Sequence, residues 1–369
     1  MLRVFAAAMG LLLFIGCAHA ETEWRVRASE GLDAVLFVGA LSGDKLQGEE
    51  YPEEIKKYRA LLTAEEIAAL DRINGFFSQP GRGLAGPSFA YSLVAAPDQS
   101  YEGVGEILRD PEAFLAENFD HTLGDGERKG FADYYTAYSA LDRIGFVDDW
   151  RANALPQIEA AIEIFQAFLA PYDLITLHEK YLGRDLDNTI EVVILHYNKP
   201  YGIRVAGQRF ATYHGWSKDT TLQTAAHEVF HPPYNADSEA LSAAAARLKD
   251  SALMRNLVEQ ADPKWGYTSF ESVLDEDSTQ ALDMLVSLQI GVDRDPADYW
   301  RAQDDGMHIL AAAIYDAMRE TGFAETGGAY EAWLIEALSG GALSPDAVEG
   351  RARLLLGDDA VDKWKPDTP

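Results

Sequence analysis

Residues 223–235 read QTAAHEVFHPPYN, and they place His227 and His231 four positions apart, with Glu228 directly after the first. Cap candidates at 219–221 precede the motif and two prolines follow it, so the sequence predicts a helix over about 221–231. Positions i and i+4 of a helix point the same way, which lets two imidazoles share one Zn²⁺ about 2.0 Å from each nitrogen. Glu228 would then lie beside the metal, where it can take a proton from a bound water.

The rest of the sequence predicts a mainly helical protein with one small sheet. The β-branched run TIEVVILHY at 189–197 and the segment 201–214 are typical of strands and lead into the motif. Residues 24–42 fit either a strand or a short buried helix. Gly-rich loops are predicted at 78–88 and 124–130, and Thr63 with Glu66 forms a capping box. Helical patterns cover about 51–77, 149–182, 237–260, 269–290, 297–321, 328–338 and 345–355. We therefore expect an α+β, mainly α fold with a helical N-terminal region and a small sheet before the motif helix.

The motif and its surroundings resemble a known class of enzymes. HEVFH after a strand region, with an acidic helix downstream, is similar to the gluzincin-type zinc metallopeptidases over roughly residues 189–290. HEVFHPPYN, with the aromatic-rich helical segment upstream, also resembles an uncharacterised family of exported bacterial HExxH proteins, diffusely back to about residue 34. The resemblance implies a zincin-like core, a Zn²⁺-dependent peptidase and a glutamate as third metal ligand.

The favoured third ligand is Glu276. It stands in an Asp-Glu pair similar to the Asn-Glu pair at the ligand of several gluzincins. Gln280 follows one turn later, where those families place a polar group, usually Asp. The helix face formed by 276, 280, 283 and 287 is polar, which suits either a metal cleft or solvent.

Two other carboxylates are alternatives for the third ligand. Glu271 begins an E-x-x-x-D pattern with Asp275 that resembles the gluzincin ligand helix, but Thr268 and Glu271 also form a capping box. Asp237 follows His231 with a spacing similar to that of short-motif zinc proteases, although the glycine of that pattern is missing here. All three carboxylates therefore remain candidates at this point.

Further residues near the motif could stabilise the oxyanion that peptide hydrolysis generates, because Tyr and His commonly donate a hydrogen bond to it. Tyr267 and His214 are the candidates, with a packing role as the alternative for each. The remaining histidines have no ligand-like spacing, and we expect no catalytic role for the segment LHEKYLG at 177–183. These histidines are His121, His178, His196 and His308.

The chain is strongly acidic, with 31 Lys plus Arg against 60 Asp plus Glu and a net charge of −29. A surface this negative repels phosphate backbones, so nucleic acid is excluded as an expected partner. The acidic residues are scattered along the chain, which is typical of a solvated surface.

The N-terminus predicts export. One Arg, a short apolar run and small residues over 1–20 fit a signal peptide, with Ala18-His19-Ala20 as cleavage site. FIGC resembles a lipobox, which would make Cys17, the single cysteine, the lipid-anchored first residue. No later apolar run is long enough for a transmembrane helix. We expect a periplasmic or secreted protein, with a lipid-anchored envelope protein as the alternative.

Together these patterns predict three segments: a signal peptide at 1–20, a helical region at 21–185 and a zincin-like metallopeptidase region at 186–369. The expected activity is hydrolysis of peptide or protein substrates through a zinc-bound water, with His227, His231 and a carboxylate as ligands and Glu228 as general base. The alternative is a non-catalytic envelope binding protein or lipoprotein with a degenerate or structural metal site.

Overall fold

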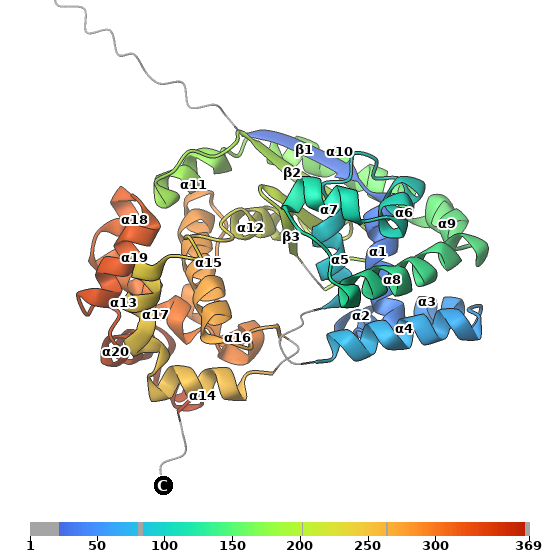
Figure 1. Cartoon of the computed structure of the whole chain (residues 1–369). Coiled ribbons are helices and arrows are strands. Elements are labelled where there is room, and N and C mark those ends of the chain that lie inside the picture. The colour runs from blue at the N-terminus through green and yellow to red at the C-terminus, as the bar shows by residue number, and fades with distance from the viewer. Residues whose placement is uncertain (1–21, 80–83, 201, 263–264, 366–369) are drawn as a thin grey trace, which may run out of the picture.

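The computed structural model of the chain describes residues 22–79, 84–200, 202–262 and 265–365. The predicted signal peptide and Cys17 lie outside these residues. Helices make up 67% of the structure, and a small sheet precedes the motif helix, which confirms the predicted α+β, mainly α fold class. In Figure 1 the sheet lies at the top of the molecule over the N-terminal helices, and the C-terminal helices lie to the left.

The sheet has four strands in the order β1-β2-β4-β3. Its bounds are β1 (Glu23–Ala28), β2 (Thr189–Leu195), β3 (Ile203–Ala206) and β4 (Arg209–Tyr213). β1, β2 and β4 run parallel, and β3 pairs with β4 in antiparallel fashion at one edge. Because β1 pairs with β2, the sheet unites residues from both sides of position 185.

Residues 24–42, which fit either strand or helix, form both. β1 is followed by α1 (Glu30–Ser42), whose N-cap Ser29 accepts a hydrogen bond from Leu32 N–H. Residues 31–42 are all buried, so α1 forms the centre of the N-terminal helices (Figure 1). This placement explains the apolar composition that made the segment ambiguous, because a helix buried on all sides shows little amphipathic periodicity.

The N-terminal helices agree with most of the predicted patterns. The Thr63–Glu66 capping box opens α4 as expected. The loop predicted at 124–130 is wrong beyond its first residue, because a 19-residue helix begins at Asp125 and runs through both glycines there. These elements are α2 (Lys45–Glu50), α3 (Pro52–Arg59), α4 (Ala64–Phe77), α5 (Ala85–Leu93), α6 (Tyr101–Arg109), α7 (Glu112–Phe119), α8 (Asp125–Arg143), α9 (Phe146–Asp149), the π-helical segment η1 (Trp150–Ala154), α10 (Leu155–Leu169) and α11 (Leu174–Leu182).

The C-terminal half is a second group of helices packed around α15. α12 contacts both α15 and β4, and α15 packs on α17. The elements are α12 (Lys218–Glu228), α13 (Glu239–Lys249), α14 (Ala252–Gln260), α15 (Phe270–Gln289), α16 (Pro296–Ala302), the 3₁₀ segment η3 (Gln303–Gly306), α17 (Ile309–Glu320), α18 (Phe323–Thr326), α19 (Tyr330–Ser339), α20 (Pro345–Leu356) and α21 (Asp358–Asp362).

None of the described helices alone combines the length and apolar composition that crossing a membrane requires. One bent pair, Phe146–Leu169 with Leu174–Leu182, meets the criteria by length and composition only.

A buried carboxylate joins α1 to the end of β2. Asp33 is fully buried and accepts hydrogen bonds from Trp150 Nε1–H at 2.6 Å and from the backbone N–H groups of His196 and Tyr197 at 2.8 and 2.6 Å. Burial raises the pKa of Asp33 to about 6, although the three donors oppose the shift. At pH 8 the carboxylate is therefore charged and depends on these donors.

Replacing Trp150 by Phe should destabilise the protein more than replacing Trp300 by Phe. Both indoles are buried, but Trp300 Nε1 has no acceptor among the described residues, so only Trp150→Phe removes a hydrogen bond. A hydrogen bond to a charged group contributes about 1.5–3 kcal/mol, and we expect a difference of that size between the variants. Urea unfolding at pH 8 measures it. Equal free energies of unfolding would contradict the role of Asp33.

Candidate metal centre

The motif helix α12 ends earlier than the sequence predicts. Its N-cap is Ser217, whose hydroxyl accepts from Thr220 N–H at 3.0 Å, and its last residue is Glu228. The predicted continuation to His231 is wrong, because the backbone turns more tightly after Glu228. Phe230 N–H donates to His227 O at 3.0 Å, so His231 lies in a turn that follows the helix.

This turn brings the two motif imidazoles and one carboxylate together. The Nε2 atoms of His227 and His231 are 3.1 Å apart, and Glu276 Oε1 and Oε2 lie 3.6 and 3.7 Å from them, respectively. A tetrahedral zinc with bonds of 2.0–2.2 Å holds its ligand atoms about 3.3–3.5 Å apart. The spacing of the three side chains therefore fits one zinc ion.

A second carboxylate lies behind each imidazole. Asp275 Oδ2 is 3.2 Å from His231 Nδ1, and Asp283 Oδ2 is 3.8 Å from His227 Nδ1. Metal-binding histidines commonly donate their other N–H to a carboxylate, which fixes the tautomer and the orientation of the ring. Both rings are thus arranged with Nε2 toward Glu276 and Nδ1 toward an acid.

Glu276 is itself held by two neighbours. Gln280 Nε2 donates to Glu276 Oε1 at 2.9 Å, and the Tyr267 hydroxyl also bonds to this carboxylate. Burial raises the pKa of Tyr267 well above its ordinary value, so the phenol remains a donor. The predicted oxyanion candidate Tyr267 therefore lies next to the carboxylate of the cluster.

The other predicted candidates lie elsewhere. Glu271 is exposed and pairs with Lys249 Nζ at 2.5 Å. The predicted Thr268 capping box is wrong, because α15 begins one residue later with Ser269 as its cap. Asp237 is exposed, and its backbone N–H donates to Asn235 Oδ1. His214 stacks on His196, with ring nitrogens 3.0 Å apart.

Glu228, the glutamate of the motif, lies next to Gly202 in the loop before β3. The residue is 8% exposed, and its negative charge is close enough to act on His227. A Cβ placed on Gly202 would come within 3.2 Å of Glu228 Oε1 and 2.6 Å of Thr224 Cγ2. Gly202 therefore leaves room for the Glu228 carboxylate beside the cluster.

The electrostatics of the cluster favour a bound positive charge. Burial by itself lowers the pKa of His227, but the charges of Glu276, Asp283 and Glu228 outweigh it and raise the pKa to about 9. Burial would raise the pKa of Glu276, but the two histidines hold it below its ordinary value. A metal cation would supply the same charge in place of protons.

A buried network that the sequence did not reveal adjoins the cluster. His308 is fully buried, with Nδ1 2.6 Å from Asp277 Oδ1 and Nε2 3.2 Å from Asp304 Oδ2. Its ring lies edge-on to Tyr267, with centroids 6.0 Å apart. The available sequence signal was the acidic pattern of α15, whose Asp277 and Asp283 are buried.

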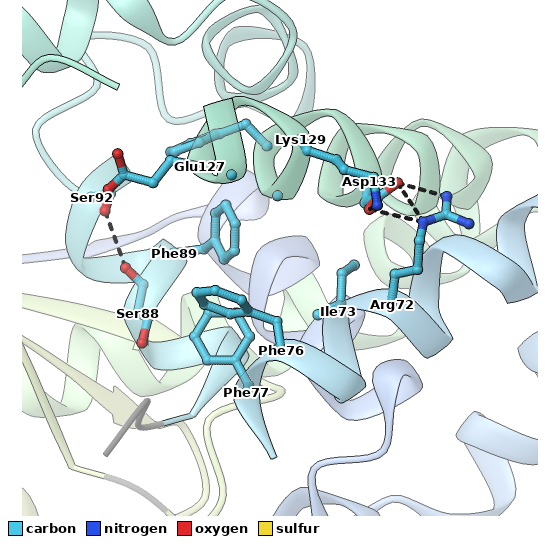
Figure 2. Close-up of a pocket in the computed structure, with 13 residues that line it drawn as sticks. Arg72, Ile73, Phe76, Phe77, Ser88, Phe89, Ser92, Glu127, Lys129 and Asp133 are labelled. Atoms are coloured by element: carbon cyan, nitrogen blue, oxygen red, sulfur yellow. Dashed lines mark hydrogen bonds and ion pairs between the residues drawn. The ribbon is translucent and has the colours of Figure 1, made fainter. Parts of the chain in front are cut away.

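A separate cavity of about 390 Å³ lies among α4, α5 and α8 (Figure 2). Four phenylalanine rings form part of its walls, and Arg72 at its rim donates to both oxygens of Asp133 at 2.6–3.0 Å. The rings are those of Phe76, Phe77, Phe89 and Phe131. The cavity shares no lining residue with the metal cluster.

Comparison with known proteins adds nothing to this geometry. No protein-family model matches the chain, and neither a curated protein nor a solved structure matches it.

Glu276→Gln should lower zinc affinity more than about 100-fold. Loss of a residue that only hydrogen-bonds to a metal ligand typically lowers affinity by about 10–100-fold, and loss of a ligand itself should have a larger effect. Glu271→Gln is the matched control, since it makes the same change at an exposed position of α15 and should leave the affinity unchanged. Competition with a chromophoric chelator measures both, and thermal unfolding checks that both variants are folded. Equal affinities in the two variants would rule out Glu276 as a ligand.

Proposed function

We propose that this chain is an exported zinc metallopeptidase that hydrolyses peptide or protein substrates. The observation that carries the proposal is the convergence of His227, His231 and Glu276, whose ligand atoms lie 3.1–3.7 Å apart. The motif glutamate Glu228 adjoins them. This set matches the three-ligand zinc site with a neighbouring general base that metallopeptidases use.

The number of ligands favours a catalytic site over a structural one. Within the described residues the cluster contains three candidate ligands. A closed structural zinc site takes four protein ligands, whereas a catalytic site keeps one position for water or substrate. The alternative of a binding protein with a structural metal is therefore less well supported by this geometry.

Each residue has a chemical role in the proposed reaction. His227, His231 and Glu276 would hold a zinc ion, which when bound would supply a Lewis acid able to lower the pKa of water and to polarise a carbonyl. Glu228 accepts the proton of the attacking water and delivers it to the leaving amine. Tyr267 is a neutral phenol whose hydroxyl bonds to Glu276, and it would have to exchange that bond for one to the developing oxyanion in order to stabilise it.

Export is part of the proposal and rests on sequence alone. The signal peptide at 1–20 would deliver the chain to the periplasm or the medium, and processing at Cys17 would leave it lipid-anchored. The acidic surface agrees with a protein or peptide substrate rather than nucleic acid.

Glu228→Gln should abolish hydrolysis but not metal binding. The amide cannot accept the proton of water, and loss of a general base typically lowers the rate by about 10²–10⁴-fold. The measurement is cleavage of a quenched-fluorescence peptide library, with zinc content determined on the same samples. Glu271→Gln is again the control and should cleave like the natural chain.

Two outcomes would contradict the proposal. A zinc-loaded natural chain that cleaves no peptide in the library would favour the binding protein. A Glu228→Gln variant with undiminished cleavage would show that another group acts as base.

Removal of zinc by a chelator should also stop cleavage, and added zinc should restore it.

A further inference from the structure

His178, in α11, contacts the motif, and α11 also packs on α15. Its ring is fully buried, and Nε2 lies 3.0 Å from Ala226 O. The same ring packs on Phe230, with centroids 4.1 Å apart and planes inclined by 39°. Ala226 directly precedes His227, and Phe230 directly precedes His231. The His178 ring therefore contacts the backbone carbonyl of the residue before the first motif histidine and the ring of the residue before the second.

The Ala226 carbonyl needs such a donor because α12 ends early. In a continuing helix Phe230 N–H would donate to Ala226 O, but here it donates to His227 O. The last carbonyls of a helix lack intrahelical partners, and leaving one buried and unpaired is unfavourable. Ala226 is fully buried, so water is a poor substitute for the imidazole.

The His178 ring faces a carbonyl oxygen at each nitrogen, and we assign its proton to Nε2. Nδ1 lies 2.6 Å from Leu174 O, a contact that a bare ring nitrogen can relieve only by moving away from the carbonyl. Leu174 O lies four residues earlier in α11 and is the expected acceptor for the backbone N–H of His178, so it keeps a donor when the ring moves. Burial lowers the pKa of His178, which favours a neutral ring with a single N–H. Of the two carbonyls, only Ala226 O depends on the imidazole for a donor.

We propose that His178 is a positioning residue of the metal centre. By donating to Ala226 O and packing on Phe230, it fixes the point at which α12 changes into a tight turn. That turn sets the approach of His231 Nε2 to His227 Nε2. The inference rests on the proposed zinc site and adds to it a residue that touches neither metal nor substrate.

The test compares three substitutions of His178. Phe keeps the ring contact but removes the donor, Gln places an amide near the position of Nε2, and Asn places one near Nδ1. Zinc affinity is measured by chelator competition, and the absorption spectrum of the Co²⁺-substituted protein reports ligand geometry. We expect His178→Phe and His178→Asn to weaken zinc binding by about 10–100-fold and to change the cobalt spectrum, as outer partners of metal sites do. His178→Gln should stay within a few-fold of the natural chain.

Tyr138→Phe is the control for a general loss of stability. Its hydroxyl is buried and donates to Tyr101 O at 2.8 Å, among the N-terminal helices. Removing it also deletes one buried hydrogen bond, but it should change neither zinc affinity nor the cobalt spectrum. A change in both would attribute the effect of His178 to stability alone and overturn the inference.

The outcomes separate this inference from the proposed function. A natural chain that binds no zinc would overturn both. A natural chain that binds zinc, with unchanged affinity and spectrum in His178→Phe, would overturn only the positioning role. Should His178→Phe fail to fold, the Gln and Asn variants decide, because Asn retaining the affinity that Gln loses would overturn the Nε2 assignment.

Discussion

Charge pairing along α15 is the constraint on which the C-terminal half depends. Asp277 and Asp283 are fully buried and Glu276 largely so, and a buried carboxylate without a partner is strongly destabilising. Each faces a base from another element: Glu276 the motif histidines, Asp277 the His308 ring before α17, and Asp283 the Arg294 guanidinium at 2.9 Å. α15 can therefore be buried only when α12, α17 and the segment before α16 surround it. The packing that forms this half of the protein also assembles the candidate metal centre.

The same pairing explains why the centre should favour a cation. Acidic groups surround His227, and their combined charge is what raises its pKa. A proton on the imidazole and a divalent ion between the ligand atoms meet the same electrostatic demand, but only the ion can be shared by all three side chains at once. The carboxylates of α15 thus stabilise the fold when paired and favour metal binding at one end of the helix.

Local sequence patterns predict the fold class, the strands and a helix cap. They do not show which side chains of different helices pair with one another. The α+β class, the strands before the motif and the Thr63 cap follow from local patterns and are confirmed. The resemblance to gluzincins favours Glu276 as third ligand, and the structure brings it to the motif histidines, while its role as a ligand stays a prediction. Asp275 and Asp283 could not be assigned to their imidazoles, because no local signal says which helix packs on which. The α15 cap lies one residue later than predicted, so Ser272 and not Glu271 occupies the capping-box position, and Glu271 lies at the surface paired with Lys249.

The early end of α12 shows why the spacing of the motif is not sufficient by itself. The i, i+4 argument assumes a continuous helix, yet here the second histidine follows the helix in a turn and still reaches the first. That geometry is stable only because other segments complete it: α11 satisfies the carbonyl that the turn leaves unpaired, and α15 supplies an acid behind each ring. A chance HExxH on a surface helix would have no such partners. The contacts that α11 and α15 make with residues 226–231 are therefore stronger grounds for a metal centre than the five-residue pattern.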